Sequence, residues 1–188
     1  MKPKLMLAAI FSILVATIST TQAQSKYFDK NCDVTFLSST PLEDIEGKNT
    51  SAVAVMDIAS GAIEVSVLVK AFSFEKALLE EHFNENYMES EKFPKATFKG
   101  KIKNISEVKL TVDGTYPITL AGTLTMHGVS REITNAGTIK VKDGIMLANA
   151  DFIVKPEDYN IEIPGMVKDK IAKEIAVKVA ANLQPYIN

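Results

Sequence analysis

Apolar and polar residues alternate along most of this chain, and a period of two residues is typical of half-buried β-strands. The alternation is clearest in residues 63–70, where Leu68 is the one exception. Further strands are predicted at residues 32–38, within residues 50–58, and at residues 96–103, 116–126 and 146–154. The pattern therefore predicts a mostly antiparallel β-sheet.

Turn residues separate these strands and define one clear hairpin. Gly61, Asp113-Gly114 and Asp143-Gly144 are turn signals between apolar segments. Residues 122–134 (GTLTMHGVSREIT) contain two alternating arms joined at His127-Gly128. The glycine can supply the positive φ that a tight hairpin needs.

Two segments depart from a simple strand pattern. Around residues 74–84 apolar positions recur every four residues and helix-favouring residues are frequent, so a short helix is predicted there. Between residues 167 and 183 the apolar positions fit both a helical and a strand period. Val177 fits only the strand, but the pattern alone does not decide between the two.

Four motifs occur in order along the chain: residues 91–98 (EKFPKATF), 122–134, 152–161 (FIVKPEDYNI) and 175–179 (IAVKV). Together they resemble the YceI-like family of exported lipid-binding proteins. The resemblance implies one all-β domain over residues 24–188, a lipocalin-like antiparallel β-barrel of about eight strands. It also implies an isoprenoid or related lipid inside the barrel, usually in the periplasm. Together with Val177, the resemblance favours a final strand from about Glu174. Closure by this strand would remove free sheet edges.

The predicted inward positions combine large apolar residues with small ones. Small inward residues leave volume that a packed core would fill, but they also fit the taper of a filled barrel. The residues alone leave a hollow and a plugged barrel equally open, and the resemblance favours the hollow one. An apolar lining implies an apolar ligand, because few polar groups would compensate for desolvating a polar one. The predicted lining consists of Phe36, Ile63, Val65, Val67, Phe98, Gly100, Leu120, Gly122, Leu124, Met126, Ala148, Ala150, Phe152, Val177 and Val179.

Arg131 is a charged residue that the hairpin would place on the apolar face. With a two-residue loop, Met126 pairs with Val129 and Leu124 pairs with Arg131. A buried unpaired guanidinium would be costly. Three outcomes are open: a bulge or a three-residue loop turns Arg131 outward, its side chain extends to the rim, or it lies at the mouth and contacts an anionic or polar head group.

The first 23 residues have the features of a cleavable secretory signal. Two lysines precede a short apolar run at residues 5–18, and residues 21–23 (TQA) resemble a cleavage site. Cleavage would leave 165 of the 188 residues, expected to be soluble and periplasmic or secreted. That part has 19 basic and 23 acidic residues, a net charge of −4, which disfavours nucleic-acid partners. Cys32 is the only cysteine, so an intramolecular disulfide is excluded and the thiol is either inert or reactive.

Candidate catalytic chemistry is sparse. The chain has two histidines and lacks the H-E-x-x-H, C-x-x-C and G-x-S-x-G patterns. His82 is expected on the helix and His127 in the turn, with ligand or metal contact as the alternative for His127. No catalytic residue, metal site or cofactor is predicted. The remaining functions are a carrier of an apolar lipid with transient membrane contact, an enzyme for a hydrophobic substrate, and a packed barrel with an interaction or stress role. The oligomeric state is open.

Overall fold

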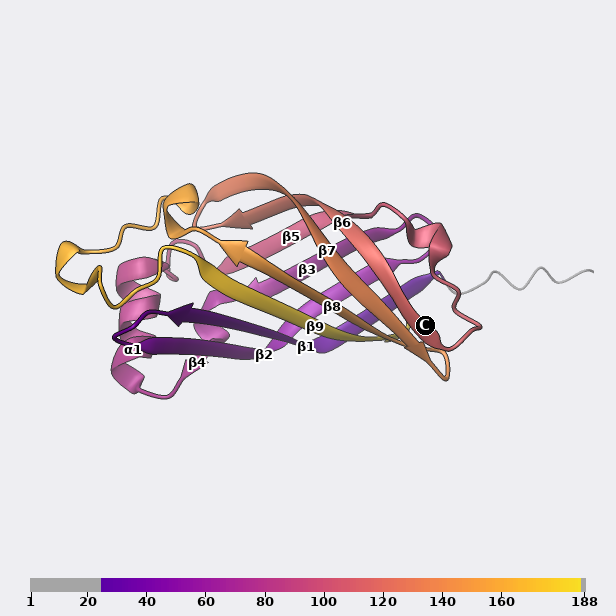
Figure 1. Ribbon diagram of the computed structural model, residues 1–188, viewed down its shortest axis with the longest axis horizontal. Helices are drawn as coiled ribbons and strands as arrows, with labels where there is room; N and C mark the ends of the chain where they lie inside the picture. The colour runs from indigo at the N-terminus through magenta and orange to yellow at the C-terminus, as the bar shows by residue number, and fades with distance from the viewer. Residues whose placement is uncertain (1–24, 187–188) are drawn as a thin grey trace, which may run out of the picture.

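Eight long antiparallel strands pair in the order β1-β9-β8-β7-β6-β5-β3-β2, and pairing of β2 with β1 closes the sheet into a barrel (Figure 1). The computed structural model describes residues 25–186. The strands are β1 (Lys26–Ser39), β2 (Asp44–Asp57), β3 (Ala62–Leu68), β5 (Lys95–Ile102), β6 (Gly114–Met126), β7 (Val129–Lys142), β8 (Ile145–Val154) and β9 (Ile175–Pro185), and the short β4 (Ser73–Phe74) pairs with β2. The antiparallel barrel expected from the sequence is confirmed. The predicted signal lies outside the described residues.

The two-residue alternation places apolar side chains inside the barrel and charged ones outside. In β5, for example, Ile102 is buried whereas Lys99 and Lys101 are exposed. β1 is longer than its apolar pattern predicts because a register shift between Asp29 and Cys32 interrupts the alternation. After this bulge, Cys32 again faces the interior and is fully buried.

β2 also begins earlier than the sequence pattern predicts. The pattern missed its first residues because two of its inward positions are not apolar. These positions are Gly47 and Asn49, which are both buried. The Asn49 amide compensates for its burial by donating a hydrogen bond of 3.0 Å to the Leu68 carbonyl. The predicted final strand is confirmed as β9.

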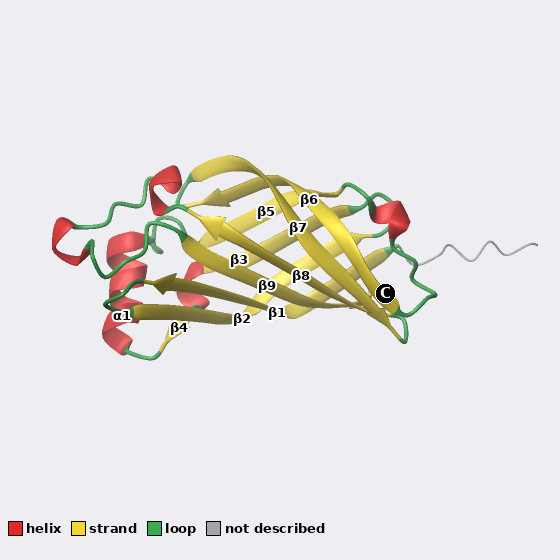
Figure 2. Cartoon of the chain, in the orientation of Figure 1, coloured by secondary structure: helices red, strands yellow, loops and turns green. Residues whose placement is uncertain are grey.

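Helical segments lie mainly at one end of the barrel (Figure 2). The predicted short helix is confirmed as α1 (Ala77–His82), and a π-helical turn, η2 (Phe83–Tyr87), continues it. Four 3-10 turns are η1 (Val69–Ala71), η3 (Ile105–Glu107), η4 (Pro156–Tyr159) and η5 (Gly165–Val167). Among residues 25–186, no helix is long and apolar enough to cross a membrane.

The two ends of the barrel differ in structure. One end, here called the open end, carries α1, the β1–β2 turn, the β6–β7 hairpin and the long β8–β9 connection (Figure 1). The other, the closed end, carries η3, the β7–β8 turn and the end of β9.

Candidate functional site: an apolar cavity in the barrel

The open half of the barrel contains a cavity of about 530 Å³. That volume lies within the range of about 300–1,000 Å³ that is usual for small-molecule sites. Strand residues form its walls, and residues of α1, η2 and the β8–β9 connection surround its mouth. The lining is mostly aliphatic and aromatic, so the cavity suits an apolar guest.

The closed half of the barrel is filled by its own side chains and forms the floor of the cavity. Met56, Ile139, Met146 and Leu183 are fully buried there, and Ile102 is 2% exposed. Val108, in the connection from β5 to β6, packs against the same core. The barrel is therefore plugged in one half and hollow in the other, which combines the two alternatives that the sequence left open.

Nearly all of the predicted lining residues border this cavity. They are Phe36, Ile63, Val65, Val67, Phe98, Leu120, Leu124, Met126, Ala148, Ala150, Phe152, Val177 and Val179. The strand alternation identified them because the pleat assigns every second residue to the interior. Their contact with a lipid stays a prediction.

Gly100 and Gly122 were also predicted to line the cavity, and the structure places them elsewhere. They are paired across β5 and β6, where the two backbones approach closely. A Cβ on Gly100 would lie 2.5 Å from the Ala121 carbonyl oxygen and 2.7 Å from the ring of Phe98. Phe98 therefore covers Gly100, and the two glycines serve sheet packing instead of creating ligand volume.

Four aromatic residues cluster near the mouth, and sequence reasoning predicted only Phe36 among them as a lining residue. The Phe36 ring lies 5.3 Å from the Phe83 ring, stacked on it, and 5.4 Å from the Phe72 ring. Phe74 joins the same cluster at 5.0 Å from Phe83. All four rings border the cavity. Three of them come from the irregular segment after β3, where the strand period gives no signal for inward positions.

Residues of the β8–β9 connection were missed for the same reason. This connection contributes Ile161, Ile163, Val167 and Ile171 to the lining. It is anchored at the open end by a 2.9 Å hydrogen bond from the Ala172 amide to the Ser38 hydroxyl. An irregular loop of this kind follows no periodic apolar pattern.

The β6–β7 hairpin has the predicted two-residue turn. Both His127 and Gly128 have positive φ, 50° and 73°. The His127 ring is only 9% exposed, with Nδ1 3.0 Å from the Tyr159 carbonyl oxygen and Nε2 2.9 Å from Glu89 Oε2. It also packs edge-on against Phe93 at 4.6 Å. His127 therefore has a turn role, as predicted, and also connects the hairpin to η4.

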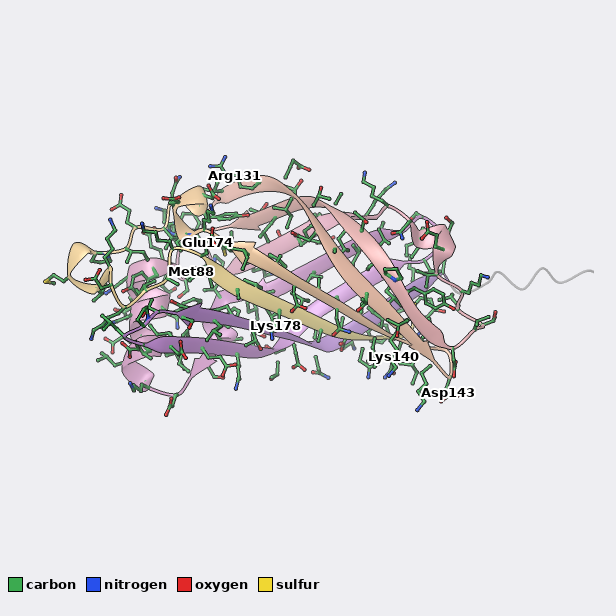
Figure 3. All side chains as sticks on the ribbon, viewed as in Figure 1. Met88, Arg131, Lys140, Asp143, Glu174 and Lys178 are labelled. Carbon is green, nitrogen blue, oxygen red and sulfur yellow. The ribbon has the colours of Figure 1, made fainter. Side chains whose placement is uncertain are left out.

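Arg131 pairs with Leu124, so the bulged-hairpin alternative is wrong. Its Nε donates a 2.9 Å hydrogen bond to the Asp158 carbonyl of η4, and the residue is exposed at the rim (Figure 3). Arg131 is not among the described residues that border the cavity. The geometry agrees with the rim alternative, and head-group contact stays a prediction.

Charged side chains near the cavity belong to segments at its mouth. Lys76 lies 3.6 Å from Glu43, and Lys170 also borders the opening. His82, on α1, is half-buried at the mouth, which agrees with the helix position expected for it. In the part of the chain that the structure describes, no cluster of three His, Cys, Asp or Glu side chains could hold a metal.

The fold and the cavity define a lipocalin-like barrel with an apolar interior. The family model of the YceI-like domain matches residues 22–183. This chain therefore belongs to the YceI-like family. The comparison with curated proteins found no match.

Solved structures with the same fold agree with this membership. A polyisoprenoid-binding domain from Saccharophagus degradans, implicated in plant cell wall breakdown, is 13% identical, with a TM-score of 0.75 over 87% of this chain and 99% of that domain. BcnA of Burkholderia cenocepacia is 17% identical, with a TM-score of 0.66 over 81% of this chain and 94% of that one. The YceI protein of Campylobacter jejuni is 19% identical, with a TM-score of 0.55 over the whole of both chains.

Proposed function

We propose that this protein is an exported carrier that binds a long apolar lipid, an isoprenoid or isoprenoid quinone, for storage, transport or scavenging. One observation carries the proposal: an apolar cavity of about 530 Å³ with a packed floor and a mouth at one end of the barrel. The related domain from Saccharophagus degradans is described as polyisoprenoid-binding, which supports the same ligand class here.

The energetics of such a cavity suit a carrier. Burial of each methylene stabilises a lipid by about 0.8 kcal/mol relative to water. Relative to a bilayer the gain is near zero, because the two environments are similarly apolar. A lipid can therefore leave one membrane for the cavity and later enter another, with the protein in transient contact with each.

Export to the periplasm or the exterior forms part of this proposal and rests on the signal-like sequence of residues 1–23. No specific feature among the described residues favours the enzyme or the interaction-module alternative. Binding is therefore the function that we propose.

Extraction of the purified protein with organic solvent, followed by mass spectrometry, tests the proposal. We expect a prenyl lipid to copurify. Delipidated protein should take up the same lipid from vesicles, and an unrelated exported β-barrel protein purified in parallel serves as the control. A protein that is empty after purification and takes up no prenyl lipid would contradict the proposed function.

A further inference from the structure

The barrel wall contains a seam between β7 and β8. Their pairing runs from Lys142–Ile145 at the closed end only as far as Gly137–Ala150. Beyond that point β7 continues along β6 as far as Val129, whereas β8 continues along β9 as far as Val154. The two strands therefore diverge toward the open end, as their ribbons do in Figure 1.

Contacts at the rim bridge this seam. Arg131 Nε donates to the Asp158 carbonyl, and His127 Nδ1 lies 3.0 Å from the Tyr159 carbonyl. Both carbonyls belong to η4, which follows β8. The unpaired part of the wall, here called the window, thus lies between the Gly137–Ala150 pair and η4. Residues of both strands line the cavity beside this window, namely Ile133 and Asn135 of β7 and Phe152 of β8.

Asn135 is a polar residue at an inward position of this window. It pairs with Leu120 and lies on the same face as Ile133 and the fully buried Ile139. The other polar residue at an inward strand position of the cavity is Ser38, whose hydroxyl accepts the Ala172 hydrogen bond. The Asn135 side chain makes no hydrogen bond to any of residues 25–186. Its amide is therefore available to a guest in the cavity.

The charges near the cavity limit the chemistry of that guest. Lysines that border the cavity, Lys76 and Lys170, belong to segments at the mouth and not to the wall strands. An anionic group beside Asn135 would lose its hydration without gaining a cation, and that desolvation is costly. A hydroxyl or carbonyl oxygen needs only the hydrogen bond that an amide provides.

We propose that Asn135 forms a polar subsite at the β7–β8 window, which selects isoprenoids that carry a neutral hydroxyl or carbonyl oxygen over pure hydrocarbons. This inference rests on the proposed lipid-binding function and names the ligand class within it. An oxygen bound there lies inside the barrel, away from the lysines of the mouth.

Two probes of equal carbon skeleton test the subsite: farnesol, which carries a hydroxyl, and the hydrocarbon farnesene. Binding to delipidated protein is measured by displacement of a fluorescent fatty-chain probe. In Asn135→Leu, we expect farnesol to bind about fivefold more weakly, which corresponds to a net hydrogen-bond contribution of about 1 kcal/mol. Farnesene binding should stay within about twofold of wild type, since Leu and Asn differ little in size.

Thr134→Leu is the matched control, because Thr134 is the exposed, outward-facing neighbour of Asn135. It should change neither affinity. Asn135→Ala provides a second variant if Asn135→Leu does not fold. Equal changes for both probes, or no change for farnesol, would overturn the subsite alone. Failure of both probes to bind wild-type protein would contradict the proposed function and the subsite together.

Discussion

Gly100 and Gly122 face each other across β5 and β6 so closely that a Cβ on Gly100 would lie 2.9 Å from the Cα of Gly122. A Cβ on Gly122 would in turn meet the Gly100 Cα and the Lys99 carbonyl. These are backbone atoms, which cannot rotate away as a flexible side chain can. The pair therefore determines how closely two wall strands approach.

Gly122→Ala should destabilise the protein by about 1 to 3 kcal/mol, because the added methyl group forces β5 and β6 apart. Denaturant unfolding monitored by circular dichroism measures this change. Gly165→Ala is the control, since a Cβ there meets nothing within 4 Å, and it should stay within about 0.5 kcal/mol of wild type. Equal stability of the two variants would show that the close approach is not required.

Ala150→Trp should fill part of the cavity and reduce the amount of copurified lipid, because Ala150 borders the cavity wall. Overpacking should cost about 1 to 3 kcal/mol, which leaves the barrel folded if its stability is ordinary. The comparison is Asp151→Trp, one residue further along β8, where the side chain is exposed and lipid content should not change. Wild-type lipid content in folded Ala150→Trp would argue against the cavity as the binding site.

His127→Asn separates the turn role of His127 from the role of its ring. Asparagine tolerates a positive φ, so the turn is kept while the ring contacts with Phe93 and the Tyr159 carbonyl are lost. We expect a loss of about 1 to 2 kcal/mol in the free energy of unfolding. Asp143→Asn, at an exposed turn residue with a φ of 51°, should be neutral. A neutral His127→Asn would reduce His127 to a turn residue alone.

Arg131→Gln should change the affinities for a phosphorylated and an uncharged prenyl lipid of equal chain length by the same factor. The guanidinium is bonded to the Asp158 carbonyl at the rim and does not border the cavity in the described part of the chain. Titration of both lipids at one salt concentration provides the comparison. A selective loss for the phosphorylated lipid would instead support contact between Arg131 and the head group.

The Cys32 thiol should react slowly with alkylating reagents in the folded protein. Burial, with smaller contributions from Asp29 and Asp33, raises the pKa of Cys32 from 9.0 to about 12. The reactive thiolate is thus scarce at pH 8, and the side chain is fully buried. Protein unfolded in denaturant is the control and should react quickly. Rapid modification of folded protein would mean that the β1 bulge opens readily.

The same pKa shift has a consequence for stability against pH. The folded state holds the Cys32 proton more tightly than the unfolded chain, so ionisation favours unfolding as the pH rises from about 9 toward 12. Cys32→Ala should lack this part of the decline in the free energy of unfolding. Parallel declines for both proteins would exclude ionisation of Cys32 as a cause.

The sequence by itself determined the barrel strands and most of the cavity wall. A pleated strand assigns alternate residues to opposite faces, so residues such as Val65, Phe98 and Ala148 could be assigned to the interior from their period alone. The His127-Gly128 turn was equally local, because a two-residue hairpin requires positive φ. Local rules thus established most of the fold.

Only the tertiary structure decided what fills the space between the walls. Gly100 and Ala148 both occupy small inward positions, yet Phe98 covers the first while the cavity borders the second. The floor depends on side chains from several strands that meet only in the closed barrel. The β7–β8 window likewise arises where two strands with continuous alternation cease to pair at Gly137–Ala150. Such features depend on distances between segments remote in sequence, which a periodic pattern does not encode.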